Sequence, residues 1–161
     1  MEDSSSTAAE SVTIRRLGPA DSGDLRALHA GLDRRDSYFR FFALLPHSVD
    51  AVARALAEND ATHTAFGAYD HGKLVGVANY VVLDDPHCAE VALVVDHAHQ
   101  GHGVGTALLR RLADDARARG ITRLVAEILP ANSKMIRLLI DSDFPITVHR
   151  GDGIIRLTAP L

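Results

Sequence analysis

The spacing of hydrophobic residues along the chain predicts seven strands. The segments concerned are apolar at every second position or throughout, as in strands buried on one face or on both. They are residues 12–17, 64–69, 74–83, 89–95, 123–129, 146–149 and 154–158. Asp70-His71-Gly72 is typical of a tight turn, and Arg150-Gly151-Asp152-Gly153 of a second one near the end of the chain. The pattern therefore predicts a sheet that contains two hairpins with short turns.

Hydrophobic residues three and four positions apart predict the helices between these strands. The strongest helix is expected from Val104 to Arg119, where Leu108, Leu112 and Ala116 share one face and Gly120 follows as a stop signal. Others are expected after an N-cap at Asp21, after Ser48, and from Asn132-Ser133 to Ile140. The resulting order, β-α-α-β-β-β-α-β-α-β-β, predicts an α/β fold with a mixed sheet.

The length of 161 residues suits one domain. Residues 1–10 are small, polar and aperiodic, which predicts a disordered N-terminal tail, and residues 11–161 are expected to form the domain. No apolar run approaches the roughly 20 residues that cross a bilayer, and the first residues lack the pattern of a signal peptide. The single cysteine, Cys88, suits a reducing compartment. We therefore expect a cytoplasmic protein.

The segment between residues 89–95 and the long helix is rich in glycine: Gln100-Gly101-His102-Gly103-Val104-Gly105. A strand, a glycine-rich loop and a helix N-terminus together present backbone N–H groups and a helix dipole to an anion. The spacing G-x-G-x-G does not match the G-x-G-x-x-G of dinucleotide-binding loops, and no lysine precedes Thr106 as in a P-loop. Gly101, Gly103 and Gly105 lack the Cβ atoms that would hold a pyrophosphate away, and we expect them to permit positive φ. The loop therefore predicts a phosphate site of another kind.

Two motifs resemble those of the GNAT acetyltransferases. Gln100-x-x-Gly103-x-Gly105 is similar to the family's Q/R-x-x-G-x-G/A motif for acetyl-CoA, and Asn132-Ser133-Lys134-Met135 is similar to its N-x-x-A/M segment, with Phe144 at the usual aromatic position. The resemblance covers about residues 11–158. It implies a mixed, mostly antiparallel sheet that is flanked by helices and splayed between two parallel central strands, here 89–95 and 123–129.

Within the family, the chain resembles bacterial protein-lysine acetyltransferases. Residues 36–42 look like an S-x-Y-x-R-F-F segment, residues 89–92 like an A-E-hydrophobic-A strand and residues 127–132 like an E-x-L-x-x-N turn. The resemblance implies acetyl-CoA as co-substrate and a protein lysine as acceptor. A small amine as acceptor, or a catalytically silent acyl-CoA-binding module, are the alternatives that the sequence leaves open.

The resemblance also implies which residues hold acetyl-CoA. The pantetheine arm is expected along a strand, the pyrophosphate at the glycine-rich loop, and an asparagine side chain beside the cofactor. The corresponding residues are Leu93, Val94, Val95, Gln100, Gly101, His102, Gly103, Val104, Gly105, Thr106 and Asn132. His102 stands where the family often has Arg or Lys, and it would lack their permanent charge towards a phosphate.

Acetylation of an amine requires a base, because a lysine with a pKa near 10.4 is almost fully protonated at pH 7. Glu90 is the main candidate, since a carboxylate in an otherwise apolar strand is costly to bury unless it has a role. The alternative is a solvated carboxylate at the end of the strand that is paired with an arginine. Glu127 is the weaker candidate. Leu139 stands where many family members have a tyrosine that acts as an acid, and Asp143 replaces a usual glycine.

Charge and composition exclude several other classes of function. A net charge of −4 provides no basic field for nucleic acid or for an anionic membrane. Among nine histidines, His97 and His99 are the closest approach to a metal site, but two ligands are too few for zinc, so we expect no metal. A partly buried thiol without catalytic function is the prediction for Cys88.

Overall fold

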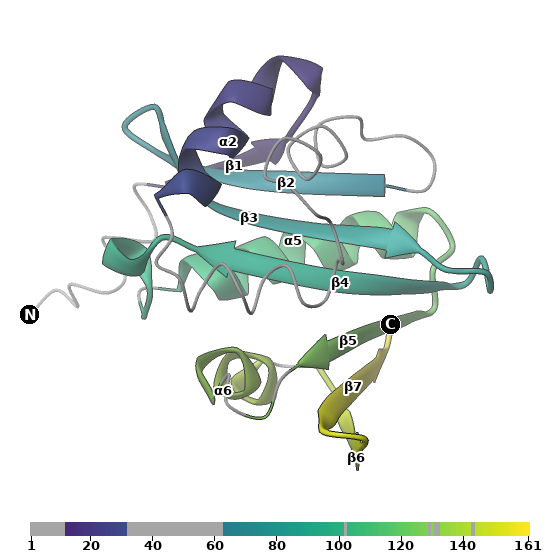
Figure 1. Ribbon diagram of the computed structural model, residues 1–161. Helices are drawn as coiled ribbons and strands as arrows, with labels where there is room; N and C mark the ends of the chain where they lie inside the picture. Colours follow the sequence, from purple (N-terminus) through teal and green to yellow (C-terminus); the bar gives the residue numbers. More distant parts are fainter. Residues whose placement is uncertain (1–11, 32–62, 102, 129, 131–132, 143) are drawn as a thin grey trace, which may run out of the picture.

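The computed structural model describes residues 12–31, 63–101, 103–128, 130, 133–142 and 144–161. Its strands form a seven-stranded sheet in the order β1-β2-β3-β4-β5-β7-β6 (Figure 1). The strands are β1 (Val12–Arg16), β2 (His63–Asp70), β3 (Lys73–Val82), β4 (Cys88–Val95), β5 (Arg123–Ile128), β6 (Thr147–Gly151) and β7 (Ile154–Pro160). The helices are α2 (Ser22–Ala30), α5 (Val104–Ala118) and α6 (Ser133–Asp141), with short 3₁₀ turns η1 (Pro19–Asp21) and η2 (His97–His99).

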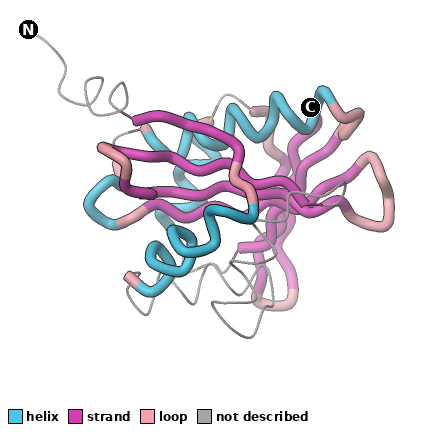
Figure 2. Tube along the Cα trace, turned by 90° about the horizontal axis from the view of Figure 1, so that it is seen from above, coloured by secondary structure: helices cyan, strands magenta, loops and turns pink. Residues whose placement is uncertain are grey.

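Helices cover both faces of the sheet, as the view from above shows (Figure 2). On one face, Leu108 and Leu112 of α5 are buried in the larger hydrophobic cluster, which also takes in Leu139 of α6. On the other face, Leu25 and Leu28 of α2 belong to a second cluster over β2 and β3. The hydroxyl of the buried Tyr80 on β3 donates a hydrogen bond of 2.7 Å to Asp115 of α5. The sheet is therefore packed on both sides where α2 and α5 lie.

Every strand pair is antiparallel except β4 and β5, which are parallel and in the middle of the sheet. These two strands pair at Cys88, Ala89 and Glu90 of β4, but β4 continues unpaired on that side as far as Val95. Figure 1 shows the two strands together at one end and apart at the other. The edge of β4 that faces β5 thus has no strand partner from Val91 onward in the described residues.

The predicted mixed sheet with two splayed parallel strands is confirmed, and the strands and helices lie within about two residues of their expected bounds. Both predicted hairpin turns are confirmed as well. His71 and Gly72, and likewise Asp152 and Gly153, have positive φ, as two-residue hairpin turns between twisted strands require. The helix expected after Ser48, the segment 36–42 and the N-terminal tail lie outside the described residues.

One local prediction is wrong in its mechanism. Asp21 precedes α2 as expected, but its side chain makes no capping hydrogen bond to the helix. Its carboxylate instead binds the Arg15 guanidinium through two contacts, of 2.7 and 3.1 Å, and accepts a hydrogen bond from the Gly18 amide. A charged, two-point contact to arginine is stronger than a single helix cap, so Asp21 ties the helix to β1.

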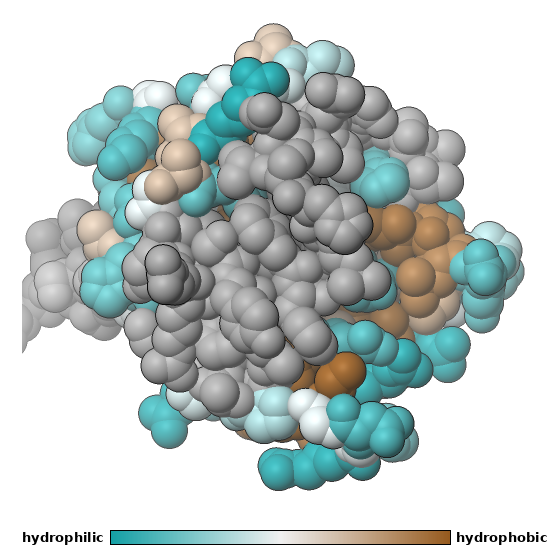
Figure 3. Space-filling view, viewed as in Figure 1, coloured by the Kyte–Doolittle hydropathy of each residue, from teal (hydrophilic) through white to brown (hydrophobic). Residues whose placement is uncertain are grey.

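The described surface offers few large hydrophobic side chains to a partner. Leu83, Ile140 and Val148 are the ones that the described residues expose. In the space-filling view, most of the coloured residues are hydrophilic, and the main hydrophobic area lies at the right, bordered by hydrophilic residues (Figure 3). No helix among the described residues has the length and the apolar character needed to cross a membrane.

Candidate functional site

The glycine-rich loop leads directly from the end of β4 into the first turn of α5. Asp96 begins the loop by accepting a hydrogen bond of 3.2 Å from the Ala98 amide. Gly101 and Gly103 have φ values of 81° and 84°, in the left-handed region that side chains with a Cβ rarely adopt. Gly103 is the N-cap of α5. The expectation that these two glycines permit positive φ is confirmed.

Gly105 has another role than the one that the sequence suggested. It lies inside the first turn of α5, not in the left-handed region. A Cβ there would come within 2.5 Å of Leu138 Cδ1 on α6 and within about 3.6 Å of Leu93 and Val95. The missing side chain at Gly105 therefore allows α6 to approach the N-terminus of α5. A positive φ plays no part at this position.

The first turn of α5 can bind an anion. Ala107 N donates to Gly103 O at 3.0 Å, which is the first hydrogen bond of the helix. The N–H groups of Val104, Gly105 and Thr106 precede it and have no partner within the helix by its geometry. The first turn contains no acidic residue, so nothing in the helix opposes a negative ligand there.

Gln100 connects the loop to the strand before it. Its side-chain Nε2 donates a hydrogen bond of 2.9 Å to the Val95 carbonyl at the end of β4. This contact fixes the loop relative to the strand, so the backbone at the strand edge and the backbone of the loop keep a constant spacing. The sequence had suggested a role in cofactor binding for Gln100, and the structure adds this internal contact.

A cavity of about 710 Å³ lies between β4, the α5 N-terminus, β5 and α6. Its volume falls in the range of small-molecule sites. Most of the residues expected at the cofactor line it, namely Leu93, Val94, Val95, Gln100, Gly101, Gly103, Gly105 and Thr106. Val104 does not, because its side chain is buried in the core. His102 and Asn132 lie outside the described residues.

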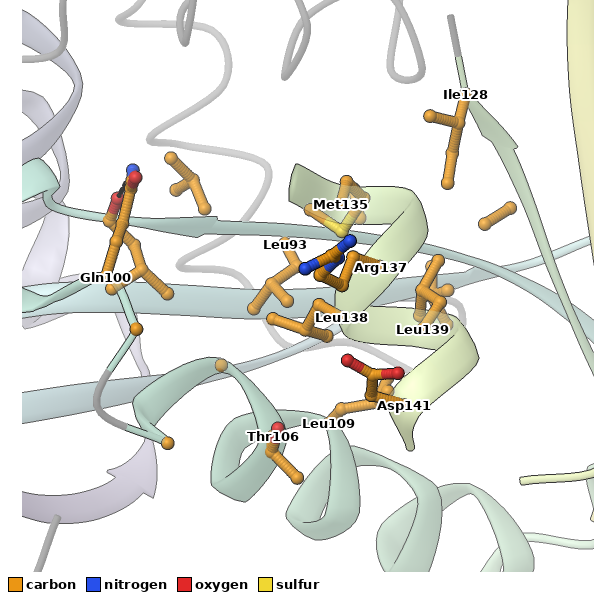
Figure 4. A pocket seen from close by; sticks show the side chains of 18 of the residues that line it. Leu93, Gln100, Thr106, Leu109, Ile128, Met135, Arg137, Leu138, Leu139 and Asp141 are labelled. Carbon is orange, nitrogen blue, oxygen red and sulfur yellow. Dashed lines mark hydrogen bonds between the residues drawn. The ribbon is translucent and has the colours of Figure 1, made fainter. Parts of the chain in front are cut away.

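Helix α6 forms a wall of the cavity that sequence reasoning missed. Met135, Arg137, Leu138, Leu139 and Asp141 line it. Figure 4 shows Arg137 and Leu138 beside Leu93 of β4, with Thr106 and Leu109 of α5 on the adjoining side. The motif at Asn132 located the start of this helix, but its amphipathic pattern could not show which face meets β4. Leu139, which stands at the family's tyrosine position, is buried in this wall.

His97 and His99 lie at the margin of the cavity. His99 Nε2 is 3.0 Å from Asp70 Oδ2, and its Nδ1 is 3.8 Å from Asp96 Oδ2. The described residues contain no group of three or more His, Cys, Asp or Glu side chains that could hold a metal ion. The imidazole of His99 is therefore placed as a link between the β2–β3 hairpin and the loop.

Glu90 is the last residue of β4 that pairs with β5, opposite Val125. Val91 and Leu93 pack into the cluster beneath α5, so Glu90 lies on the opposite face, which it shares with Ala92 and Val94, as alternation predicted. Glu90 is half-buried. Burial raises the pKa of its carboxyl, Glu127 raises it further, and Arg156 lowers it.

Glu127 lines the cavity, whereas Glu90 is not among the lining residues. The Glu127 carboxylate accepts a hydrogen bond from the Arg156 guanidinium on β7 and forms an ion pair with it. The structure thus brings both candidate glutamates to one face of the sheet at the point where β4 and β5 separate. Arg156 lies on the same face and interacts with both glutamates. No signal in the sequence pointed to this residue, because its contact with Glu127 depends on the register of β5 with β7.

Comparison with known proteins places this arrangement in a family. The model of the acetyltransferase (GNAT) family matches residues 31–140. The GNAT domain of S. lividans PAT is similar at 32% identity and a TM-score of 0.82, over 93% of this chain and 90% of that one.

Two more distant structures share the fold. A ribosomal-protein-alanine N-acetyltransferase from Brucella melitensis has 22% identity and a TM-score of 0.73, over 92% of this chain and 99% of its own. A spermidine N-acetyltransferase from Vibrio cholerae, solved with CoA and spermine, has 19% identity and a TM-score of 0.71, over 94% and 96%.

Proposed function

Because the chain belongs to the GNAT family of acetyltransferases, we propose that it transfers the acetyl group of acetyl-CoA to a primary amine, the side chain of a protein lysine. Members of this family use acetyl-CoA. The observation that carries the proposal is the open edge of β4, which runs beside the cavity that the first turn of α5 also borders. The lysine acceptor is supported by the resemblance of residues 36–42, 89–92 and 127–132 to bacterial protein-lysine acetyltransferases.

The residues of the cavity fit acetyl-CoA. Residues 91–95 span roughly 16 Å at about 3.3 Å per residue, and alternate residues direct N–H and C=O groups towards the gap. An extended pantetheine arm, which carries two amides, is complementary to such an edge. Gly101 and Gly103 have no Cβ and allow close approach of a pyrophosphate to the loop and to the first N–H groups of α5.

The reaction needs a neutral amine and a stabilised oxyanion. Glu90 is the proposed base: its raised pKa makes it a better proton acceptor than an exposed glutamate. Glu90 accepts one proton from the acceptor ammonium, directly or through a water molecule, and the freed nitrogen attacks the thioester carbonyl carbon to form the new C–N bond. The C–S bond then breaks, and the second proton of the nitrogen passes to the departing CoA thiolate, which leaves the amide and free CoA thiol. A backbone N–H on the open edge of β4 donates to the thioester carbonyl oxygen, where negative charge develops.

The test is incubation of the protein with radiolabelled acetyl-CoA and a cell lysate, with release of free CoA thiol measured in parallel. Radiolabel in protein lysines is the expected result. Radiolabel confined to small amines would contradict a protein lysine as acceptor but would agree with acetyl transfer to an amine. Binding of acetyl-CoA without thiol release would contradict catalysis and identify a silent acyl-CoA-binding module. A Gly103→Val variant, with a damaged loop, controls for transfer by other proteins in the lysate.

A further inference from the structure

Glu127 is held in place by a neighbour on the adjacent strand. Glu127 of β5 and Arg156 of β7 are directly opposite each other in the antiparallel register and share a face of the sheet. Their side chains are bonded, although about a third of the Glu127 side chain is exposed. A surface carboxylate would otherwise sample several rotamers, so the contact keeps the Glu127 charge at one position beside the cavity.

Glu90 and Glu127 are near each other across the seam between β4 and β5. Glu90 is in register with Val125, and Glu127 follows two residues later on the same face of β5. Two residues along a strand and one strand spacing across correspond to about 8 Å between Cα atoms in a regular sheet. The divergence of β4 and β5 beyond Glu90 and Val125 lengthens this distance here. A carboxylate charge acts on a second carboxyl over this distance when the second group is half-buried. The Glu127 charge therefore bears on Glu90.

We propose that Glu127 and Arg156 are positioning residues for Glu90: the held Glu127 carboxylate keeps Glu90 a strong proton acceptor, and Arg156 both fixes Glu127 and limits its effect. This inference rests on the proposed function of Glu90 as base. Other titratable side chains on the same face of the described strands are Cys88, Arg123, His149, His63, Tyr69 and Arg15. None of them interacts with both glutamates as Arg156 does. The charge of Arg156 lowers the pKa of Glu90, and its guanidinium donates a hydrogen bond to Glu127.

The two positioning residues have opposite effects on Glu90. Glu127 disfavours the charged form of Glu90, so Glu127→Gln lowers the pKa of Glu90 and moves the acid limb of the rate profile to lower pH. Arg156 favours the charged form, so Arg156→Gln moves that limb to higher pH. We expect each shift to be about 0.5–1 pH unit, because Glu127 and Arg156 are partly solvated. Loss of packing would not produce shifts of opposite sign.

The experiment follows the pH dependence of kcat/KM in the wild type, Glu127→Gln, Arg156→Gln and the double variant. The control is Asp114→Asn, which makes the same carboxylate-to-amide change on the far face of α5, where Asp114 is exposed. We expect opposite shifts in the single variants, a small shift in the double variant and none in the control. Unmoved acid limbs in both single variants, or shifts in the same direction, would overturn the proposal.

A second measurement separates this proposal from the proposed function. The Glu90 carboxyl is titrated by NMR in carbon-labelled protein, with its signal assigned by its loss in Glu90→Gln. The titration midpoint should move down in Glu127→Gln and up in Arg156→Gln, with or without an acceptor. An unmoved midpoint overturns the positioning role even if Glu90→Gln is inactive. An active Glu90→Gln variant would show that Glu90 is not the base. The proposed link of Glu127 and Arg156 to catalysis would then fail as well.

Discussion

The two strands that border the seam differ in how they are buried. Almost every residue of β4 is buried, because both faces of the strand are covered, and Glu90 is both its one charged residue and its one partly exposed residue. In β5, buried residues alternate with partly exposed ones, and Glu127 occupies a partly exposed position. A carboxylate at such a position is ordinary in a strand with one solvated face, whereas one inside a doubly covered strand is costly. The difference identifies Glu90 as the residue that needs a functional explanation.

The largest expected effect tests this contrast between the two glutamates. Glu90→Gln keeps the shape but removes the proton acceptor, so kcat should fall by about 10²–10⁴-fold while acetyl-CoA affinity stays unchanged. Glu127→Gln, the matched control, should lower kcat by less than about tenfold. Steady-state kinetics across pH checks both variants. The Glu90→Gln rate should approach the wild-type rate towards pH 10, where the amine loses its proton unaided.

An inactive Glu127→Gln together with an active Glu90→Gln would contradict the assignment of Glu90 as the base. The base would then be the cavity-lining carboxylate on β5, and the burial of Glu90 would serve another purpose. Loss of acetyl-CoA binding in Glu90→Gln would likewise assign Glu90 to the structure of the cofactor site.

The next effect concerns the segments that join these strands to α5. Gly103 follows β4 and Gly120 precedes β5, and both have a φ of 84°. A valine costs about 1–3 kcal/mol of backbone strain at either position. At Gly103 it also obstructs the phosphate loop, so Gly103→Val should weaken acetyl-CoA binding by about 10–100-fold. Gly120→Val should leave the affinity unchanged and lower the free energy of unfolding. Calorimetric titration of the two folded variants with acetyl-CoA measures both affinities. Equal affinities would contradict a role for Gly103 in the cofactor site.

A smaller effect measures the unequal burial of the strands directly. Val91 of β4 is 8% exposed and belongs to the core cluster, whereas Val125 of β5 is partly exposed. Val91→Ala should lower the free energy of unfolding by about 2–3 kcal/mol, and Val125→Ala by about 1 kcal/mol. Urea unfolding of the two variants checks this. Equal losses would mean that β5 is covered as fully as β4 in solution.

The smallest expected effect is on the pH dependence of the free energy of unfolding. Burial raises the pKa of Glu90 in the folded state above its unfolded value. Folding therefore favours protonated Glu90, and this contribution is present below the unfolded pKa and is lost as pH rises through the folded pKa. Glu90→Gln should thus be more stable than the wild type at pH 7, by less than about 1 kcal/mol because Glu90 is partly solvated. Denaturant unfolding at pH 4 and pH 7 should show the difference only at pH 7.

The loop shows which parts of the site can be predicted from sequence. Gly101 and Gly103 were expected to adopt positive φ and do so, because that requirement is local to each residue. The role of Gly105 differs from the expected one, because it depends on Leu138, which α6 places against it from 33 positions further along the chain. For the same reason the wall formed by Arg137, Leu138 and Asp141 could not be foreseen from the pattern of α6.

The positions of the described strands and helices, the two hairpin turns and the glycine conformation before α5 follow from local features of the chain. Each of these depends on hydrophobic period or backbone preference within a few residues. The pairing of β4 with β5 at residues 88–90, their separation beyond it and the contact of Arg156 with Glu127 depend on how the chain folds in three dimensions. These features arise from register between segments far apart in the chain, and a shift of one residue would turn Glu127 or Arg156 to the other face of the sheet.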